Sequence, residues 1–383
     1  MELFRHELYK VFTRKIVWIG LLFATVLILF SSSMSASQLT QTYGNMSDFY
    51  QNLYSSKEGP ISDQLQQEAS EWLRANGQAL SLKMATGQVS IQEKRTLTFY
   101  SQIIMPDTLS EKRADKISSL QNDGKNAENS YEKKKADLNI SMLNSVKTSS
   151  LYFTLPLEDD INFPMGLGFV VMGILVLIGV SPIFTEEYST NMDLLILSSK
   201  RGRRSVVTSK ILSTVVYCIF IALFVLLLNF LIQAVFLGIH GFNAPIQLKS
   251  VFTDSPYAIT YGTYLLIQFG LSTLACAFFG LFVLFVSSIS VNVLLPFFIC
   301  GTIFASTAFI NALGPAVPTV LAEFSKLSYT ELMRVDELFK SFNSYNLFGQ
   351  PVLYLNMIIG LYLIITALFI YSTYTVFRRR EAK

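Results

Sequence analysis

The sequence predicts an all-α integral membrane protein with six transmembrane helices and a helical extracellular domain between the first and second helix. Apolar residues make up 51% of the 383 residues, charged residues make up 15%, and the mean hydropathy is +0.43. Soluble domains are less apolar, and about a quarter of their residues are charged. A long polar stretch at 35–164, between two uncharged runs, indicates the extracellular domain.

Each predicted transmembrane helix is an uncharged apolar run that is long enough to cross about 30 Å of hydrocarbon. The six runs are 16–34, 165–184, 211–239, 261–287, 291–313 and 352–377. The first run follows four basic residues and has no Ala-x-Ala cleavage signal after Phe30. We therefore expect a retained membrane anchor rather than a removed signal peptide.

The basic residues predict the orientation. Six crossings place 1–15, 185–210 and the basic tail 378–383 on one side, and these segments hold 13 of the 30 Lys and Arg residues. Cytoplasmic loops are enriched in Lys and Arg. We therefore expect a multi-pass protein of the plasma membrane with both termini in the cytoplasm. The turn at 287–292 has no charge, so parity alone places the fourth and fifth helices.

Residues 1–15 have the pattern of a helix that lies in the membrane interface. Phe4, Leu8 and Phe12 recur at helical spacing on one face, and the basic residues lie elsewhere. The alternative is a simple extension of the first transmembrane helix.

The stretch 35–164 carries a net charge of −3, contains no cysteine and shows helical periodicity. A domain of this length is large enough for a modest core of its own. Thr108 and Glu111, which follow Pro106, have the form of a capping box and predict that a helix begins there. The apolar stripes favour an antiparallel helical hairpin over a ligand site.

The segment 315–350 precedes the last transmembrane helix and is amphipathic. Val320, Phe324, Leu327, Val335 and Leu338 share one helical face, and acidic and basic residues fill the other. The segment is too polar to cross the membrane. We expect it to lie on the outer surface or to dip partway into the membrane.

The sequence shows no motif that carries chemistry. It has no Gly-x-x-x-x-Gly-Lys-Ser/Thr phosphate loop, its two histidines are far apart, and its three cysteines lie in different transmembrane runs. We expect the cysteines to be buried packing residues. No catalytic, cofactor-binding or metal-binding residue is predicted, so the chain is not expected to be an enzyme.

The transmembrane runs contain amides but no Asp, Glu, Lys, Arg or His away from their ends. The amides are Asn229, Gln233, Gln268 and Asn356. They line a translocation path or form hydrogen bonds between helices, and both interpretations stay open. A transporter that is coupled to an ion gradient needs ionisable groups at membrane depth. If this chain moves a substrate uphill, the energy must arrive from another subunit.

The cytoplasmic segment 185–210 contains a predicted short amphipathic helix. Its acidic and apolar positions are Glu186, Glu187, Met192, Leu194, Leu195 and Leu197. Acidic residues near its start and basic residues from 200 to 204 near its end suit the helix macrodipole. The helix is a candidate contact for a partner protein, and the alternative is a solvated loop.

The chain resembles the ABC type-2 transporter permeases, the membrane subunits of exporters whose ATPase is often a separate chain. The resembling residues are Glu7-Leu-Tyr-Lys10, Phe184-Thr-Glu-Glu-Tyr188, Leu194-Leu-Ile-Leu-Ser198, Arg203 with Arg204, and Lys210. The resemblance implies that 1–15 is an interface helix and that the helix around Leu194 couples to the ATPase. The sequence departs from the family pattern at Asn191-Met192, where Gly-Thr is usual, and at Lys200, where a proline is usual.

The resemblance also implies partners and a cofactor. We expect a separate bacterial ABC ATPase subunit that binds ATP and Mg²⁺, a second permease chain in a homodimer or heterodimer, and membrane lipid. We expect no cofactor in this chain and no nucleic acid. The alternative function is a membrane sensor or assembly scaffold whose extracellular helical domain binds a ligand or partner.

Overall fold

The membrane part of the protein is helical. The computed structural model describes residues 2–127, 129–190, 192, 202–313, 318 and 325–379. In these ranges five helical stretches are long and apolar enough to cross a membrane: α2 (Lys15–Tyr43), Leu155–Ser189, α11 (Gly202–Leu237), α12 (Tyr261–Ile289) and α17 (Tyr354–Arg379). α13 (Leu294–Leu313) occupies the place of the predicted fifth span and is 20 residues long, and Leu294–Thr307 is the apolar stretch found among the described residues. An all-α membrane protein is therefore confirmed, and the described residues contain five candidate spans, so the predicted sixth is not confirmed.

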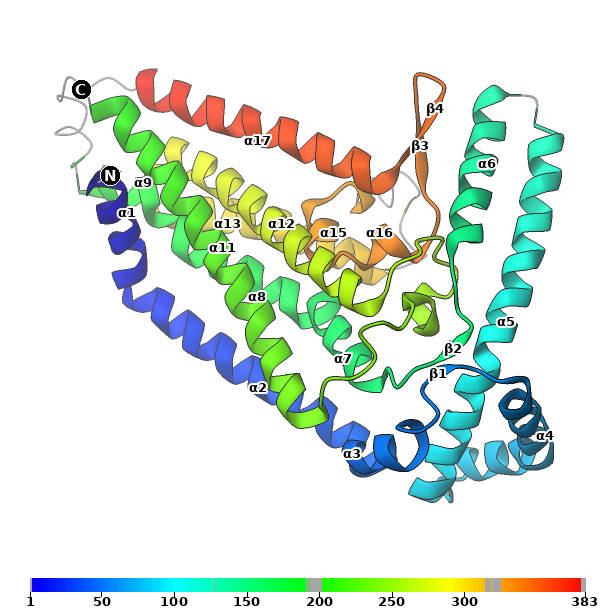
Figure 1. Ribbon diagram of the computed structural model, residues 1–383. Coiled ribbons are helices and arrows are strands. Elements are labelled where there is room, and N and C mark those ends of the chain that lie inside the picture. Colours follow the sequence, from blue (N-terminus) through cyan, green and yellow to red (C-terminus); the bar gives the residue numbers. More distant parts are fainter. Residues whose placement is uncertain are drawn as a thin grey trace.

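The spans form one bundle whose two ends differ (Figure 1). α1 (Glu2–Thr13), α9 (Pro182–Ser189) and the end of α17 lie at one end, which we call the terminal end. α4 (Asp63–Ala85), α5 (Ile91–Lys125) and α6 (Ser130–Ser145) lie at the opposite end, which we call the far end. Both ends of the described chain thus lie on one side of the bundle.

The stretch Leu155–Ser189 runs through the bundle as four consecutive elements. They are α7 (Leu155–Phe163), the π-helical turn η2 (Pro164–Gly168), α8 (Phe169–Val180) and α9. α8 is packed against α2, α11, α12 and α13. The contact with α11 depends on a glycine, since a Cβ atom at Gly179 would lie 2.2 Å from the ring of Tyr217. Such small residues let membrane helices approach closely.

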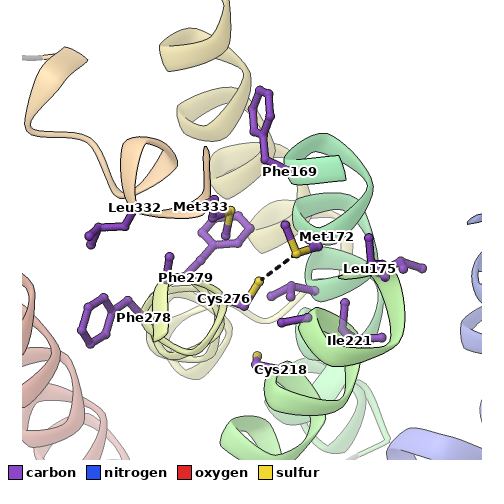
Figure 2. Packing of buried hydrophobic residues seen from close by; sticks show 14 of the residues in the cluster. Phe169, Met172, Leu175, Cys218, Ile221, Cys276, Phe278, Phe279, Leu332 and Met333 are labelled. Atoms are coloured by element: carbon purple, nitrogen blue, oxygen red, sulfur yellow. Dashed lines mark hydrogen bonds between the residues drawn. The ribbon is translucent and has the colours of Figure 1, made fainter. Parts of the chain in front are cut away.

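Figure 2 shows the core where α8, α11 and α12 meet. The Sγ atom of Cys276 on α12 donates to the Sδ atom of Met172 on α8 at 3.8 Å. Cys218, Cys276 and Cys300 are all free and buried, in agreement with the predicted packing role. A Cβ atom at Gly280 would lie 2.2 Å from Sγ of Cys218, so α12 also meets α11 at a glycine.

The region between α2 and α7 is helical, as predicted, but its boundaries differ. α2 continues past the predicted end at 34 to Tyr43, and α3 (Met46–Phe49) and the π-helical turn η1 (Tyr50–Tyr54) follow. A short strand pair, β1 (Gly59–Pro60) and β2 (Ser150–Leu151), closes the region at its base. The predicted helical hairpin corresponds to α5 and α6, which pack along each other.

The prediction that a helix begins at Thr108 is wrong. α5 begins at Ile91, where Ser90 and Glu93 form the capping box, and it runs through Pro106 without ending. A proline inside a helix removes one hydrogen bond and crowds the preceding turn. Here the ring of Pro106 is buried, and α5 packs against α4 and α6 on either side of it. This packing holds the helix together.

The predicted amphipathic segment before α17 is divided into short elements. It forms α15 (Tyr329–Arg334) and α16 (Asp336–Lys340), followed by the hairpin of β3 (Ser344–Leu347) and β4 (Gln350–Leu353). The break falls at Val335, whose φ of 69° is unfavourable for a β-branched residue. α15 is buried against α12, where the hydroxyl of Ser272 donates to the carbonyl of Met333 at 2.7 Å. Val320 and Phe324 lie outside the described residues.

Candidate functional site

Four charged residues from three helices meet inside the terminal end of the bundle. Glu7 and Lys10 lie on α1, Glu187 lies on α9, and Lys210 lies near the start of α11. Glu7, Glu187 and Lys210 are buried, and Lys10 is half-buried. We call these four residues the terminal-end cluster.

The local structure explains how α1 reaches this position. Arg14, between α1 and α2, has an extended backbone with ψ of 121°, so the two helices do not form one continuous rod. α1 therefore packs across the N-terminal half of α11 (Figure 1). The ring of Phe12 lies 5.7 Å from that of Tyr217 and 5.1 Å from that of Phe220, both on α11. These contacts aim Glu7 at Lys210.

Lys210 is the centre of the cluster and is fully buried. Its Nζ atom lies 3.0 Å from Oε2 of Glu7 and 2.8 Å from Oε1 of Glu187, and it also donates to the carbonyl of Ile183 at 3.0 Å. Lys10 lies 3.0 Å from the same Oε1 atom of Glu187 and 3.3 Å from Oε1 of Glu7. Two carboxylates and two ammonium groups thus neutralise each other. A buried charge needs such a partner, because isolation from water is costly.

The surroundings of Glu7 and Lys10 favour the ionised form of each side chain. Burial alone raises the pKa of Glu7, but the charges and hydrogen bonds of Lys210 and Lys10 outweigh burial and leave this pKa below its ordinary value. Burial likewise lowers the pKa of Lys10, but Glu187 and Glu7 outweigh it and leave this pKa above its ordinary value. Each group therefore favours the arrangement that pairs α1 with α9 and α11.

Arg14 makes a second connection at the same end. One guanidinium nitrogen lies 2.5 Å from Oε2 of Glu186, and the other donates to the carbonyl of Gly179 at 3.0 Å. Arg14 thus joins the start of α2 to the end of α8 and to α9. Glu186 itself is exposed, so this ion pair contributes less than a buried one.

The junction between α8 and α9 is supported from α12. Pro182 opens α9 and has no backbone N–H to donate. The hydroxyl of Ser287 accepts from the N–H of Phe184 at 3.2 Å and donates to the carbonyl of Ser181 at 2.8 Å. One side chain thereby serves backbone groups on both sides of the junction.

The predicted coupling residues fall into three groups. Glu186 and Met192 are exposed. Glu187 is turned into the bundle and is bound by this chain's own lysines, which the sequence did not indicate. Leu194, Leu195 and Leu197 lie outside the described residues. Of the predicted interface positions, Phe4, Leu8 and Phe12 are all half-buried.

The four amides in the spans do not share one environment. Asn229 donates to Oδ1 of Asp160 on α7 at 2.7 Å and accepts from the hydroxyl of Ser32 on α2 at 3.4 Å, so it connects helices. Gln233 and Gln268 are buried, and Asn356 is exposed. Within the described residues, neither amide atom of Gln268 has a hydrogen-bond partner.

A second group of buried charges lies at the far end. Asp336 lies 2.6 Å from Nζ of Lys340 and 3.4 Å from one guanidinium nitrogen of Arg334. The other guanidinium nitrogen of Arg334 lies 3.7 Å from Glu331. Nε of Arg334 donates to the carbonyl of Met165 at 3.1 Å. We call Glu331, Arg334, Asp336 and Lys340 the far-end cluster. It holds the break at Val335 against η2.

The described residues contain no group of three or more His, Cys, Asp or Glu side chains that is arranged to hold a metal ion. A groove of about 480 Å³ lies between α11 and α17 at the terminal end, and Arg204, Thr208 and Arg378 line part of it.

Comparison with known proteins gives the family. The sequence model of one family, described as ABC-2 family transporter protein, matches residues 1–382. No curated protein and no solved structure matches the sequence. The match covers the membrane helices, the terminal-end cluster and the far-end domain. This multi-pass membrane chain therefore belongs to the ABC-2 transporter family, whose members are permease subunits of ABC transporters.

Proposed function

We propose that this chain is the membrane permease of an ATP-driven exporter in the bacterial plasma membrane, and that a separate ABC ATPase with bound ATP and Mg²⁺ drives it. One observation carries the proposal. α9 precedes the segment 191–201, and α11 follows it. Glu187 and Lys210 join these two helices to each other, and Glu7 and Lys10 join both of them to α1. A push on this segment would move the three helices together.

The distribution of charge supports an external energy source. α2, α12 and α13 carry no Asp, Glu, Lys, Arg or His beyond their first residue, and α11 carries none after Lys210. The buried carboxylate of Asp160 lies in α7, near the start of the stretch Leu155–Ser189, and is bound by Asn229. A gradient-coupled transporter holds its ion with such groups at membrane depth. The sequence also lacks a phosphate loop. The work must then enter through a contact with another protein.

The proposed docking surface is the predicted helical segment 186–197, of which 186–189 form the last turn of α9 instead of the start of a new helix. A helix that lies in a groove binds through a few apolar residues, and charges orient it. Leu194 and Leu195 are the proposed apolar contacts, with Met192 and Leu197 beside them. Glu187 does not take part, because Lys10 and Lys210 hold it within the bundle. Glu186 is exposed and is the acidic residue left to face the ATPase.

The orientation and the second chain follow from charge and exposure. The terminal end carries the basic segments that favour the cytoplasm, so the far-end domain would be extracellular. α2 and α17 expose much of their apolar surface, with 28% and 11% of their most apolar stretches buried. Lipid and a second permease chain are the proposed occupants of these faces.

The docking proposal is tested by changing Leu194 and Leu195 together to Asp. Loss of two apolar contacts at the centre of an interface costs about 2 kcal/mol or more for each hot-spot residue. We expect the ATPase to stop co-purifying and the permease to stop stimulating ATP hydrolysis. The matched control changes Leu82 and Met84, two exposed apolar residues of α4 at the far end, to Asp. This control should keep both properties.

The opposite outcome has a clear meaning. If the ATPase stays bound and is still stimulated after the double change at 194 and 195, this helix does not dock the ATPase. The alternative of a membrane sensor or assembly scaffold, with the far-end domain as the binding part, would then be favoured.

A further inference from the structure

The hairpin of β3 and β4 carries an aromatic side chain that is almost fully exposed. Phe348 is 98% exposed and Leu347 is 56% exposed, and both lie at the tip of the hairpin. The strands pair from Ser344 with Leu353 to Leu347 with Gln350, which leaves a two-residue turn of Phe348 and Gly349. The tip therefore presents apolar surface that the described part of the chain does not cover.

The backbone of this turn is unfavourable for phenylalanine. Phe348 has φ of 50° and Gly349 has φ of 79°, so both central residues are left-handed, as in a type I′ turn. Asn and Gly are preferred at such positions because they tolerate positive φ. The side chain of Asn346 accepts from the N–H of Gly349 at 2.8 Å and supports the turn. Neither turn geometry nor a core contact explains why residue 348 is phenylalanine.

The hairpin is continuous with a membrane span. β4 ends at Leu353, and α17 begins at Tyr354, whose N–H donates to the carbonyl of Asn343 at 3.0 Å. Four residues per strand at about 3.3 Å each place the tip about 13 Å from the start of the span. The hairpin rises beside the start of α17 and next to α6 (Figure 1).

The composition of this region fits lipid. No Asp, Glu, Lys or Arg occurs from 341 to 377, through the hairpin and nearly all of α17. Leu363, Ile364 and Leu368 on α17 are exposed and form its apolar outer face. Aromatic and apolar side chains on an uncharged segment next to a span favour the membrane interface. The rim of a protein interface is polar and commonly charged.

We propose that the β3–β4 hairpin is a membrane-interface anchor that inserts Phe348 and Leu347 into the lipid leaflet at the far end of the bundle. The ligand is the boundary between lipid headgroups and acyl chains. The anchor would fix the start of α17 and the break at Val335 relative to the membrane surface. This inference rests on the membrane fold and not on the proposed ATPase contact.

The test measures the depth of residue 348 in the full-length protein reconstituted in lipid vesicles. Trp18 and Trp72 are changed to Phe, and Phe348→Trp supplies the single fluorophore. We expect brominated lipids to quench this tryptophan and aqueous iodide to have little effect. The control is Leu82→Trp in the same background, since Leu82 is 71% exposed on α4 in the polar region between α2 and α7. It should be quenched by iodide, and its quenching by brominated lipid should be several-fold weaker.

Two results would overturn the proposal. Quenching of residue 348 by iodide as strong as at residue 82 would place the tip in water. Protection from both quenchers would place it against protein, such as a second copy of the chain. If the tryptophan background fails to fold, Phe348→Cys and Leu82→Cys replace it, because Cys218, Cys276 and Cys300 are buried. A membrane-impermeant maleimide should then label residue 82 several-fold faster than residue 348, and equal labelling would reject the anchor.

Discussion

The terminal-end and far-end clusters both bury opposite charges, but they connect different parts of the chain. In the terminal-end cluster, Lys210 and Glu7 are 203 positions apart in sequence, and the charges come from three helices. In the far-end cluster, the charged side chains all fall within 331–340. The first cluster fixes separate helices to each other, and the second fixes one break in the chain. Buried ion pairs thus serve two purposes in one bundle, and under the proposed function the terminal-end pairs would transmit motion.

The comparison predicts the largest difference for the two lysines. Lys210→Met leaves two buried carboxylates with Lys10 alone, and breaking a buried pair costs about 3 kcal/mol or more of unfolding free energy. Lys340→Met removes a partly exposed partner and should cost about 1 kcal/mol. Reversible unfolding in mixed micelles measures both. Equal losses would show that the two clusters contribute alike.

The pH dependence sharpens the comparison at α1. Because the folded pKa of Glu7 is lowered, its contribution to stability is complete above the unfolded pKa of about 4.3 and is lost as the pH falls through the folded pKa. Because the folded pKa of Lys10 is raised, its contribution is complete below about 10.4 and is lost as the pH rises through the folded pKa. Protection of α1 backbone amides from hydrogen exchange, corrected for intrinsic rates, should form a plateau between these limits. A steady change across neutral pH would contradict the assignment, and Glu7→Gln should remove the acid limb.

The smallest expected effects come from two serines of α12 whose hydroxyl groups each bond to the backbone of a neighbouring element. Ser287→Ala removes the bonds at the α8–α9 junction, and Ser272→Ala removes the bond to Met333 beside the far-end break. Each change should cost about 1 kcal/mol of stability. We expect Ser287→Ala alone to reduce permease-stimulated ATP hydrolysis, since it loosens the helix that leads to the docking segment. A similar reduction with Ser272→Ala would remove the distinction between the two ends.

Hydropathy and periodicity predicted most of the fold. Uncharged runs mark α2, α11, α12 and α17 because hydrocarbon excludes charge over a fixed length. Local signals were less reliable. Pro106 looked like a helix break, but packing of α5 on its neighbours overrides the lost hydrogen bond. Val335 looked like one position in a helical stripe, but tertiary contacts hold it in a left-handed conformation.

The candidate site was harder to predict than the fold. Glu187 was expected, with Glu186, to meet a partner or to favour the start of the predicted coupling helix. Its burial depends on Lys10 and Lys210, which are 177 and 23 positions away. Periodicity does not indicate which distant charges meet. Two features of the sequence did point to this site. Glu7 lies on the apolar side of a short helix, and a lysine lies at the start of an apolar span. Each of these charges needs a partner when it is buried.

The central claim is that the terminal-end cluster makes α1, α9 and α11 move as one unit when the ATPase binds. It is tested most directly by Glu7→Gln, which removes the charge that pairs α1 with Lys210 and keeps the size of the side chain. The measurement is ATPase co-purification together with ATP hydrolysis by the complex in vesicles. Glu2→Gln, an exposed acid on the same helix, is the control. The account predicts that Glu7→Gln keeps the ATPase bound but loses the stimulation of hydrolysis, while Glu2→Gln keeps both. Full stimulation with Glu7→Gln would show that α1 is not part of the coupling.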